Sequence, residues 1–478
     1  MTSPVGGKRA RPRDVAGALP RPRAVALLSG ALALAAADQT VAGAVAPDLK
    51  ADLMVGNTRI GLLVTAASVA AALTTLPFGM LADRTRRVRL LAGCALIWSA
   101  SMVLAGFAHS YSTLLVAQIA LGAGVGATGP VVASLSGDLF DTAVRGRALG
   151  LILAGEFAGA ASGLLIAGEV AAVWSWRGSF WVLAAVGPLL AVALVHGLAE
   201  PARGQQQQHT PQRAPEAKAA GLAAAVRRTG AQPRESLILT GDPARKPLGW
   251  AVRYVLSIPS NVVIIVASAL CYFYVAGIQT FAVVFLRGRF DLSQQLATAL
   301  LVLIGAGVIL GILISGQVSD RLIARGRAAA RPLVGGLFFL AAVLFFVPGF
   351  VLPVALAAIP LLFLGAAGLG GVNPPLDAAR LDVMHSRLWG RAESVRTFCQ
   401  TLFKSGAPLL FGYLSTVLAA PGERADAVQG GGATGLTRTF LVLQVLLAAA
   451  GLVLLVARRG YLRDVATAVA SERATSVT

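Results

Sequence analysis

Long apolar runs recur along almost the whole chain, and they constrain its fold more than any other feature. Of the 478 residues, 56% are hydrophobic and 13% are charged, and the mean hydropathy is +0.73. Runs of ~20 apolar residues match the ~30 Å hydrocarbon layer of a bilayer, whereas one aqueous core would not bury so much apolar surface. Backbone groups in lipid must bond within their own segment, so we expect helices. Twelve segments are predicted, at approximately 24–46, 58–82, 89–108, 112–137, 145–172, 178–199, 261–287, 294–319, 332–350, 353–380, 392–420 and 437–459.

The first apolar segment differs from a cleaved signal peptide in two ways. It is longer than the apolar region of a signal, and it carries Asp38 and Gln39, where a signal would be purely apolar. We therefore expect it to remain in the protein as the first membrane span.

The basic residues are distributed unevenly over the loops. The net charge is +19, and with the N-terminus inside, 33 of the 41 Lys and Arg residues fall in the expected cytoplasmic segments. Seven fall in the outer segments, and Lys404 lies within a span. This bias indicates a multi-pass protein of the cell membrane with both termini in the cytoplasm. The basic excess is thus a topological signal, and nucleic acid is not an expected partner.

A short turn pattern occurs twice and indicates an internal duplication. Gly79–Arg84 and Gly316–Arg321 share the pattern Gly-x-x-x-Asp-Arg, and each ends an apolar run just before a cluster of arginines. The fold class is therefore an all-α membrane protein of two pseudo-symmetric six-helix halves, an arrangement that places a binding site between the halves. Asp83-Arg84 maps onto Asp320-Arg321 at an offset of 237, and Pro130, Asp138 and Gly146–Ala148 map onto Pro374, Asp382 and Gly390–Ala392 at 244.

A polar, proline-rich stretch separates the two halves. We expect it to be a cytoplasmic linker, mobile over much of its length, with a short interfacial helix around Trp250 and Tyr254. The expected organisation is a basic cytoplasmic tail at 1–23, an N-terminal half at 24–200, the linker at 201–255, a C-terminal half at 256–460 and a cytoplasmic tail at 461–478.

The turn motifs resemble the major facilitator superfamily over essentially the whole chain. The resemblance rests on residues 79–87, on the weaker copy at 316–327 and on the Arg145-Gly146-Arg147 turn. It implies alternating access, with a cytoplasmic charge network that latches helix ends together in the outward-facing state. The alternative is that these residues are solvated anchors that obey the positive-inside rule. The latch candidates are Gly79, Asp83, Arg84, Arg87, Asp138 and Arg145 in the first half, and Gly316, Asp320, Arg321, Asp382 and Arg391 in the second.

Within the superfamily, the first span and its sequel resemble the spinster-like lipid transporters. The matching stretches are Asp38–Gly43, Pro47–Leu49 and, in the seventh span, Tyr272–Gly277. This resemblance implies an amphipathic lipid, a lysolipid or a lipophilic metabolite as substrate. The chain departs from the pattern at Gln118 and Val125, which stand where that group has an arginine and an acidic residue associated with proton coupling.

Three ionisable residues fall deep within predicted spans, where charge is costly and therefore indicates function. Asp38 is our main candidate for a proton- or cation-responsive group; the alternative is a structural hydrogen-bond partner of a nearby span. Glu156 and Lys404 have opposite charge and similar predicted depth, so we hypothesise that they pair across the halves in one state and separate in the other. All three are candidates for ion coupling.

Few other polar or aromatic side chains are placed to face a cavity. Such a sparse set suits an amphipathic or lipophilic solute better than a sugar or a peptide. The cavity candidates are Gln39, Gln118, Tyr272, Tyr274, Gln279, Asn373 and Gln400.

These features predict a secondary active transporter coupled to protons or another ion. A proton-driven multidrug exporter is the alternative of the same class, and a transporter-derived membrane sensor is one of another class. An enzyme is not expected, since no nucleophile–base or metal constellation is visible and Cys94, Cys271 and Cys399 lie far apart. We expect a small-molecule substrate, no metal or cofactor, and a monomer in the lipid bilayer.

Overall fold

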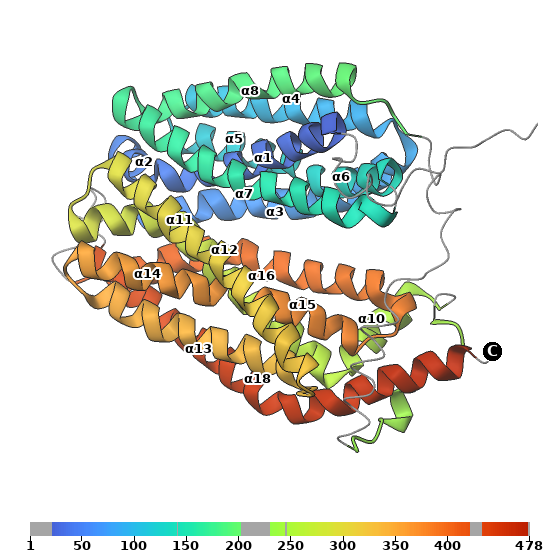
Figure 1. The fold of residues 1–478 in the computed structure, drawn as a ribbon. Helices are drawn as coiled ribbons and strands as arrows, with labels where there is room; N and C mark the ends of the chain where they lie inside the picture. The colour runs from blue at the N-terminus through green and yellow to red at the C-terminus, as the bar shows by residue number, and fades with distance from the viewer. Residues whose placement is uncertain (1–21, 141, 202–229, 244–245, 421–432, 477–478) are drawn as a thin grey trace, which may run out of the picture.

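The computed structural model describes residues 22–140, 142–201, 230–243, 246–420 and 433–476, and within these ranges the chain is helical (Figure 1). The first half contains α1 (Pro22–Ala44), α2 (Ala46–Leu53), α3 (Asn57–Arg84), α4 (Arg87–Gly106), α5 (Tyr111–Val125), α6 (Thr128–Leu139), α7 (Thr142–Val173) and α8 (Trp176–Gly197). The second contains η1 (Glu235–Leu237), α10 (Leu248–Ser257), α11 (Pro259–Phe290), α12 (Gln294–Ala324), α13 (Ala330–Val351), α14 (Ala355–Gly370), α15 (Asn373–Asp382), η3 (Ser386–Leu388), α16 (Trp389–Val417) and α18 (Ala433–Ser476).

The twelve-helix fold is confirmed. Eleven stretches of the described chain are long and apolar enough to cross a membrane. The twelfth is α16, whose apolar character is diluted by basic residues, Lys404 among them. Two of the spans are broken at matching places, between α5 and α6 at Gly126 and between α14 and α15 at Gly371. The duplication inferred from the sequence is therefore visible in the helix breaks as well.

Close packing of α7 on α1 stabilises the first half. Gly155, Gly159 and Gly163 lie at intervals of four on α7, on the face that contacts α1. A side-chain carbon at Gly159 would overlap the backbone of Ala33, and one at Gly163 would overlap Ala37. The two helices therefore contact each other closely along about two turns.

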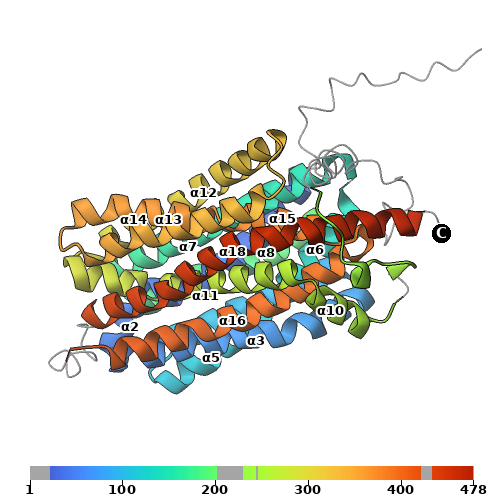
Figure 2. The same cartoon turned by 90° about the horizontal axis from the view of Figure 1, so that it is seen from below.

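The two halves lie one above the other in Figure 1 and approach each other at one end. We call the end of the bundle that carries Pro22 and the C-terminal turns of α18 the terminal end, and the end that carries α2 the opposite end. At the opposite end, α3 lies beside α16 (Figure 2), and Gly61 faces the backbone of Pro408 so closely that no side chain would fit. The halves are thus in direct contact there.

Hydrogen bonds between the halves are confined to the same region. Asn57 Nδ2 donates to Ser415 Oγ (3.0 Å), and Gln294 Nε2 donates to Ala44 O (2.5 Å). Arg287 Nη1 lies 3.3 Å from Asp48 Oδ1 on α2. Among the residues whose side chains are described, no hydrogen bond or ion pair joins the halves toward the terminal end, where Phe398 is 65% exposed. The halves are therefore joined at the opposite end, and their helices lie further apart at the terminal end (Figure 1).

The described part of the linker is docked on the second half. Arg234 Nε lies 2.7 Å from Asp464 Oδ1, and the Leu239 amide donates to Ser471 Oγ (3.1 Å). Both partners belong to α18, which continues to Ser476 through the stretch expected to be a polar tail. The short helix expected around Trp250 is present as α10. Residues 202–229 lie outside the described residues.

Substituting Gly159 by alanine tests the importance of the α1–α7 contact. The added methyl group would collide with the Ala33 backbone, so we expect the free energy of unfolding to fall by about 1–3 kcal/mol. Gly150, on the same helix, has open space where a methyl group would point, and Gly150→Ala is the matched control. Thermal unfolding in detergent measures both, and equal melting temperatures would contradict the close contact.

A second test concerns Lys50 of α2, which is completely buried and has no hydrogen-bond partner for Nζ among the described residues. Burial lowers the Lys50 pKa from 10.5 to about 8. Between these two values the unfolded chain binds more protons than the folded one, so stability should rise with pH, by at most about 1.4 kcal/mol per pH unit. Lys50→Met should remove this rise in unfolding scans above pH ~8. An unchanged pH profile in that variant would exclude Lys50 as its source.

Candidate functional site

A cavity of about 190 Å³ lies between the two halves. Six helices contribute to its wall: α1, α3, α5 and α7 from the first half, and α11 and α16 from the second. Its position beside the closed opposite end agrees with the midplane site expected for a duplicated transporter. The wall includes six of the residues predicted from the sequence: Asp38, Gln39, Gln118, Glu156, Gln279 and Lys404.

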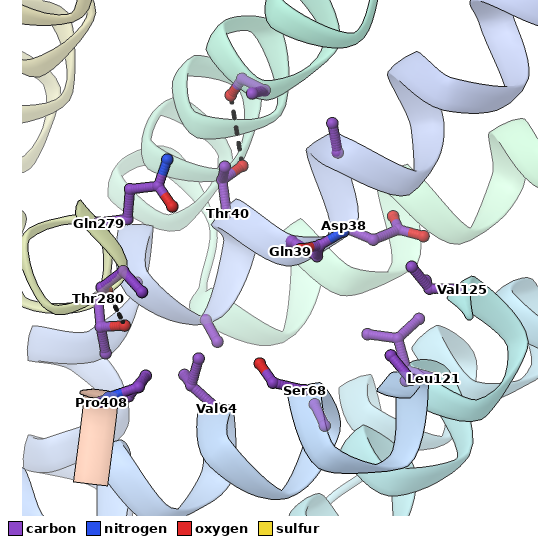
Figure 3. A pocket seen from close by; sticks show the side chains of 18 of the residues that line it. Asp38, Gln39, Thr40, Val64, Ser68, Leu121, Val125, Gln279, Thr280 and Pro408 are labelled. Carbon is purple, nitrogen blue, oxygen red and sulfur yellow. Dashed lines mark hydrogen bonds between the residues drawn. The ribbon is translucent and has the colours of Figure 1, made fainter. Parts of the chain in front are cut away.

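The polar run of α1 supplies one side of this cavity. Figure 3 shows the Asp38 carboxylate turned toward α5, near Leu121 and Val125. Asp38 is 3% exposed, and neither carboxylate oxygen has a hydrogen-bond partner in the part of the chain that the structure describes. Gln118 of α5 is also buried, and its Nε2 lacks a partner there. The carboxylate therefore has no structural partner among the described residues in this state.

Glu156 and Lys404 lie on the same cavity wall but come from different halves. Glu156 belongs to α7 and Lys404 to α16, and the two side chains interact electrostatically. No ion pair within 4.0 Å connects them. The structure thus brings the two charges to one cavity without direct contact.

Four predicted cavity residues lie elsewhere in the second half. Tyr274 is 1% exposed; it packs among phenylalanines, including Phe411, and its hydroxyl donates to Phe440 O (3.1 Å). The ring is buried among apolar side chains and the hydroxyl has a hydrogen-bond partner, so Tyr274 lies in the core and not on the cavity wall. Tyr272 is partly buried on α11 and is absent from the cavity wall. Asn373 and Gln400 both bind the Ser268 hydroxyl, at 3.2 and 2.5 Å, and form a polar cluster between helices of the second half.

Three hydroxyl side chains on the cavity wall were missed by the sequence analysis. They are Thr40, Ser68 and Thr280. Thr40 and Thr280 donate to backbone carbonyls one turn earlier in their own helices, Ala37 O and Ala276 O. Serine and threonine make such hydrogen bonds to their own helix in any membrane span. The sequence therefore does not distinguish the hydroxyl residues that line a cavity from those that do not.

The latch candidates of the first half form a buried ion cluster at the terminal end. Arg87 is 2% exposed, and its Nη1 lies 2.5 Å from Asp138 Oδ2. Its Nε lies 3.1 Å from Glu200 Oε1, and Glu200 also accepts from the first amides of α4, those of Arg87 and Val88. A carboxylate at a helix N-terminus interacts favourably with the helix dipole. The cluster joins α4, α6 and the segment that follows α8.

The second half repeats this ion pair. Arg331 forms an ion pair with Asp382, and Asp382 Oδ2 accepts from the Tyr461 hydroxyl (2.5 Å). Arg331 and Asp382 are the counterparts of Arg87 and Asp138 at the offset of 244. Arg331 is not among the candidates from the sequence. The preceding Asp-Arg turn follows the offset of 237, which maps Arg87 onto residue 324, seven residues before Arg331.

The remaining latch candidates are spread over the same end. The side chains of Asp83 and Arg145, and the surroundings of Gly79, lie outside the described part of the structure. Each described ion pair at the terminal end joins elements on the same side of the cavity, and none links the halves. Arg84, Asp320 and Arg321 are exposed, Gly316 is half-buried, and Arg391 Nη1 donates to Lys246 O (2.8 Å).

Removing one member of a repeated pair tests its contribution to stability. Arg331→Gln would leave the Asp382 carboxylate without its cation, and breaking a buried pair in this way costs about 3–5 kcal/mol. We expect a corresponding loss of stability in thermal unfolding in detergent. The exposed Arg459 offers a control of equal charge change, Arg459→Gln. If both variants unfold at the wild-type temperature, the buried pair contributes nothing.

The comparisons with known proteins agree with this architecture. Residues 28–408 match the family model of the Major Facilitator Superfamily. Over 128 residues the chain is 36% identical to a probable 4-methylmuconolactone transporter of Cupriavidus pinatubonensis, which covers 26% of this chain and 29% of that one. A probable L-galactonate transporter of Escherichia coli is 28% identical over 145 residues, 30% of this chain and 32% of the relative. The matches thus span about a third of these relatives' own length.

Solved structures extend the likeness to nearly the full chain, at the level of the fold. A bacterial homologue of the human lysosomal transporter Spinster, inward-facing and occupied, aligns with a TM-score of 0.72 over 94% of this chain and 99% of its own, at 21% identity. The nucleoside transporter NupG aligns with a TM-score of 0.62 over 92% and 99%, at 12% identity. With a family model that matches most of its length, the chain belongs to the major facilitator superfamily.

Proposed function

We propose that the protein is a secondary active transporter that moves a small amphipathic or lipophilic solute by alternating access, coupled to protons or another ion. The observation that carries this proposal is the cavity between the halves, with three ionisable residues on its wall. The contacts between the halves at the opposite end supply a closed gate on one side of the cavity. Relatives that are named as transporters of small metabolites support the same general function.

The terminal end is the cytoplasmic face in this proposal. The loops expected at that face carry 33 of the 41 basic residues, which is the bias of cytoplasmic loops in the cell membrane. Both termini then lie in the cytoplasm, and the structure represents the state that is open inward. An outward-open state would require the contacts between α3 and α16 to separate and the terminal ends of the two halves to meet.

Asp38 is the proposed coupling residue. Its buried carboxylate has no hydrogen-bond partner among the described residues, and a proton or small cation is the partner that it lacks. Because Gln118 and Val125 occupy the positions where the spinster-like group has an arginine and an acidic residue, Asp38 would act without them. Glu156 and Lys404 are proposed to pair in another state of the cycle.

Two observations bear on the substrate. The cavity volume of about 190 Å³ favours a small solute or one part of a larger amphipath. Two relatives are named for L-galactonate and for 3-(3-hydroxy-phenyl)propionate, and both of these solutes are carboxylates. A small amphipathic acid therefore fits the proposal best, ahead of a lysolipid. Proton-driven multidrug export is the alternative.

Reconstitution in liposomes tests the proposal. A panel of organic acids, neutral metabolites, lysolipids and drugs would be offered under an imposed pH gradient, with uptake and proton flux recorded. We expect at least one class of solute to accumulate and to carry protons with it. Transport of drugs but of no other class would favour the multidrug exporter. Binding of a solute without transport of any would favour a sensor.

Asp38→Asn tests the coupling role. Removing the titratable group while keeping its size should abolish accumulation driven by the pH gradient, while equilibrium binding of the same solute remains. Asp291→Asn is the matched control, since Asp291 is exposed at the opposite end and asparagine tolerates its left-handed backbone (φ 50°). Gradient-driven accumulation at the wild-type level in Asp38→Asn would remove Asp38 from the coupling role.

A further inference from the structure

We infer that Lys404 is the residue that recognises the substrate, by binding its acidic group, and that Glu156 competes with the substrate for Lys404. The inference rests on the proposed transport function and adds to it the chemical class of the ligand and the side chain that selects it. It follows from the partners of the charged groups that line or flank the cavity.

Most of these charged groups are already neutralised at close range. Arg87 and Arg331 each contact a carboxylate of their own half. Arg380 and Arg396, at the terminal end of the second half, form ion pairs with Glu393, and Arg396 also lies 2.9 Å from Asp377. An anion that approached any of these arginines would have to displace a bound carboxylate.

Lys404 is in a different position. Among the described residues on the cavity wall it is the only basic one, and no carboxylate of the described chain lies within 4.0 Å of it. Its counter-charge, Glu156 of the other half, acts on it without an ion pair within 4.0 Å. A cation held in a largely apolar wall with its counter-charge at a distance gains from a closer anion, because the interaction strengthens as separation falls.

Lys404 belongs to a row of polar residues on α16. Residues 396, 400, 404 and 408 lie at intervals of four and so share one face of α16. Lys404 and Pro408 line the cavity, Gln400 binds Ser268, and Arg396 lies two turns nearer the terminal end. Toward the terminal end this face is packed within the second half, where Gln400 is buried and Arg396 is ion-paired, so Lys404 is the charged group of this row that reaches the cavity.

The carboxylates on the wall are less suited to hold a cationic substrate. Asp38 is turned toward α5, away from the side of the cavity where Gln279 and Thr280 lie (Figure 3). Glu156 is the remaining acid, and it interacts with Lys404 already. An acidic solute at Lys404 would have the amides of Gln39 and Gln279, one from each half, on the same wall. Such a solute would link the two halves directly.

Equilibrium binding to the purified, full-length protein in detergent tests the inference. The probes are 3-phenylpropionate, 3-phenylpropionamide and 3-phenylpropylamine, which share one apolar body and differ in charge. We expect the carboxylate to raise the melting temperature and the other two to leave it unchanged. Lys404→Gln should weaken carboxylate binding at least ~10-fold, Lys404→Arg should retain most of it, and Glu156→Gln should strengthen it by removing the competitor.

Matched variants control for charge and for folding. Arg459→Gln removes an exposed positive charge, and Glu169→Gln removes an exposed negative charge from the same helix as Glu156. Neither should alter binding of the carboxylate. Retention of binding by Lys404→Arg shows that loss in Lys404→Gln reflects the missing charge and not a failure to fold.

Three outcomes would overturn the inference. These are equal binding of amide and carboxylate, binding of the amine that is lost in Glu156→Gln, and carboxylate binding that survives in Lys404→Gln. Each of them is compatible with transport in liposomes, where a neutral or cationic solute would still accumulate. Failure of the inference is therefore distinguishable from failure of the proposed function.

Discussion

The structure depends on one constraint, which is that polar and charged groups within a bilayer must find partners inside the protein. At the terminal end, each half meets this constraint with its own ion pairs. Arg87 is enclosed by Asp138 and Glu200 in the first half, and Arg331 by Asp382 and Tyr461 in the second. Because these contacts stay within a half, relative movement of the halves leaves them intact, and each half can behave as one body.

The interface between the halves follows a different rule. Where they touch, at the opposite end, the contacts combine close backbone approach at Gly61 with a few neutral hydrogen bonds and one partly exposed ion pair between Asp48 and Arg287. Such contacts are individually weak and are easily replaced by water. The strong buried ion pairs thus stabilise each half separately, and the weaker contacts join one half to the other. This division suits a protein whose halves move relative to each other.

Much of this architecture is predictable from the sequence, for physical reasons. Apolar length and charge bias are properties of whole segments. The prediction of twelve helices in two halves therefore does not depend on the interpretation of any single residue. Asp38, Glu156 and Lys404 were found because charge in a span is rare enough to stand out. Arg331 was missed because an insertion shifts the frame of the repeat, and Tyr274 was placed in the cavity because an aromatic ring serves a core or a cavity equally well. Which face of a helix a given tyrosine or glutamine occupies depends on its neighbours in space, and no single sequence contains that information.

The glycine contact between α1 and α7 has a consequence for the charges in the cavity. Asp38 and Glu156 are carried by these two helices, whose backbones are in contact along the stripe of Gly155, Gly159 and Gly163, whereas Lys404 belongs to the other half. In the proposed cycle this helix pair holds the spacing between the two carboxylates, and Lys404 moves relative to both. When the halves tilt, the electric field of Lys404 at each carboxylate changes with the distance between the halves. The protonation of the two carboxylates would therefore depend on the position of Lys404, and so on the conformation of the protein.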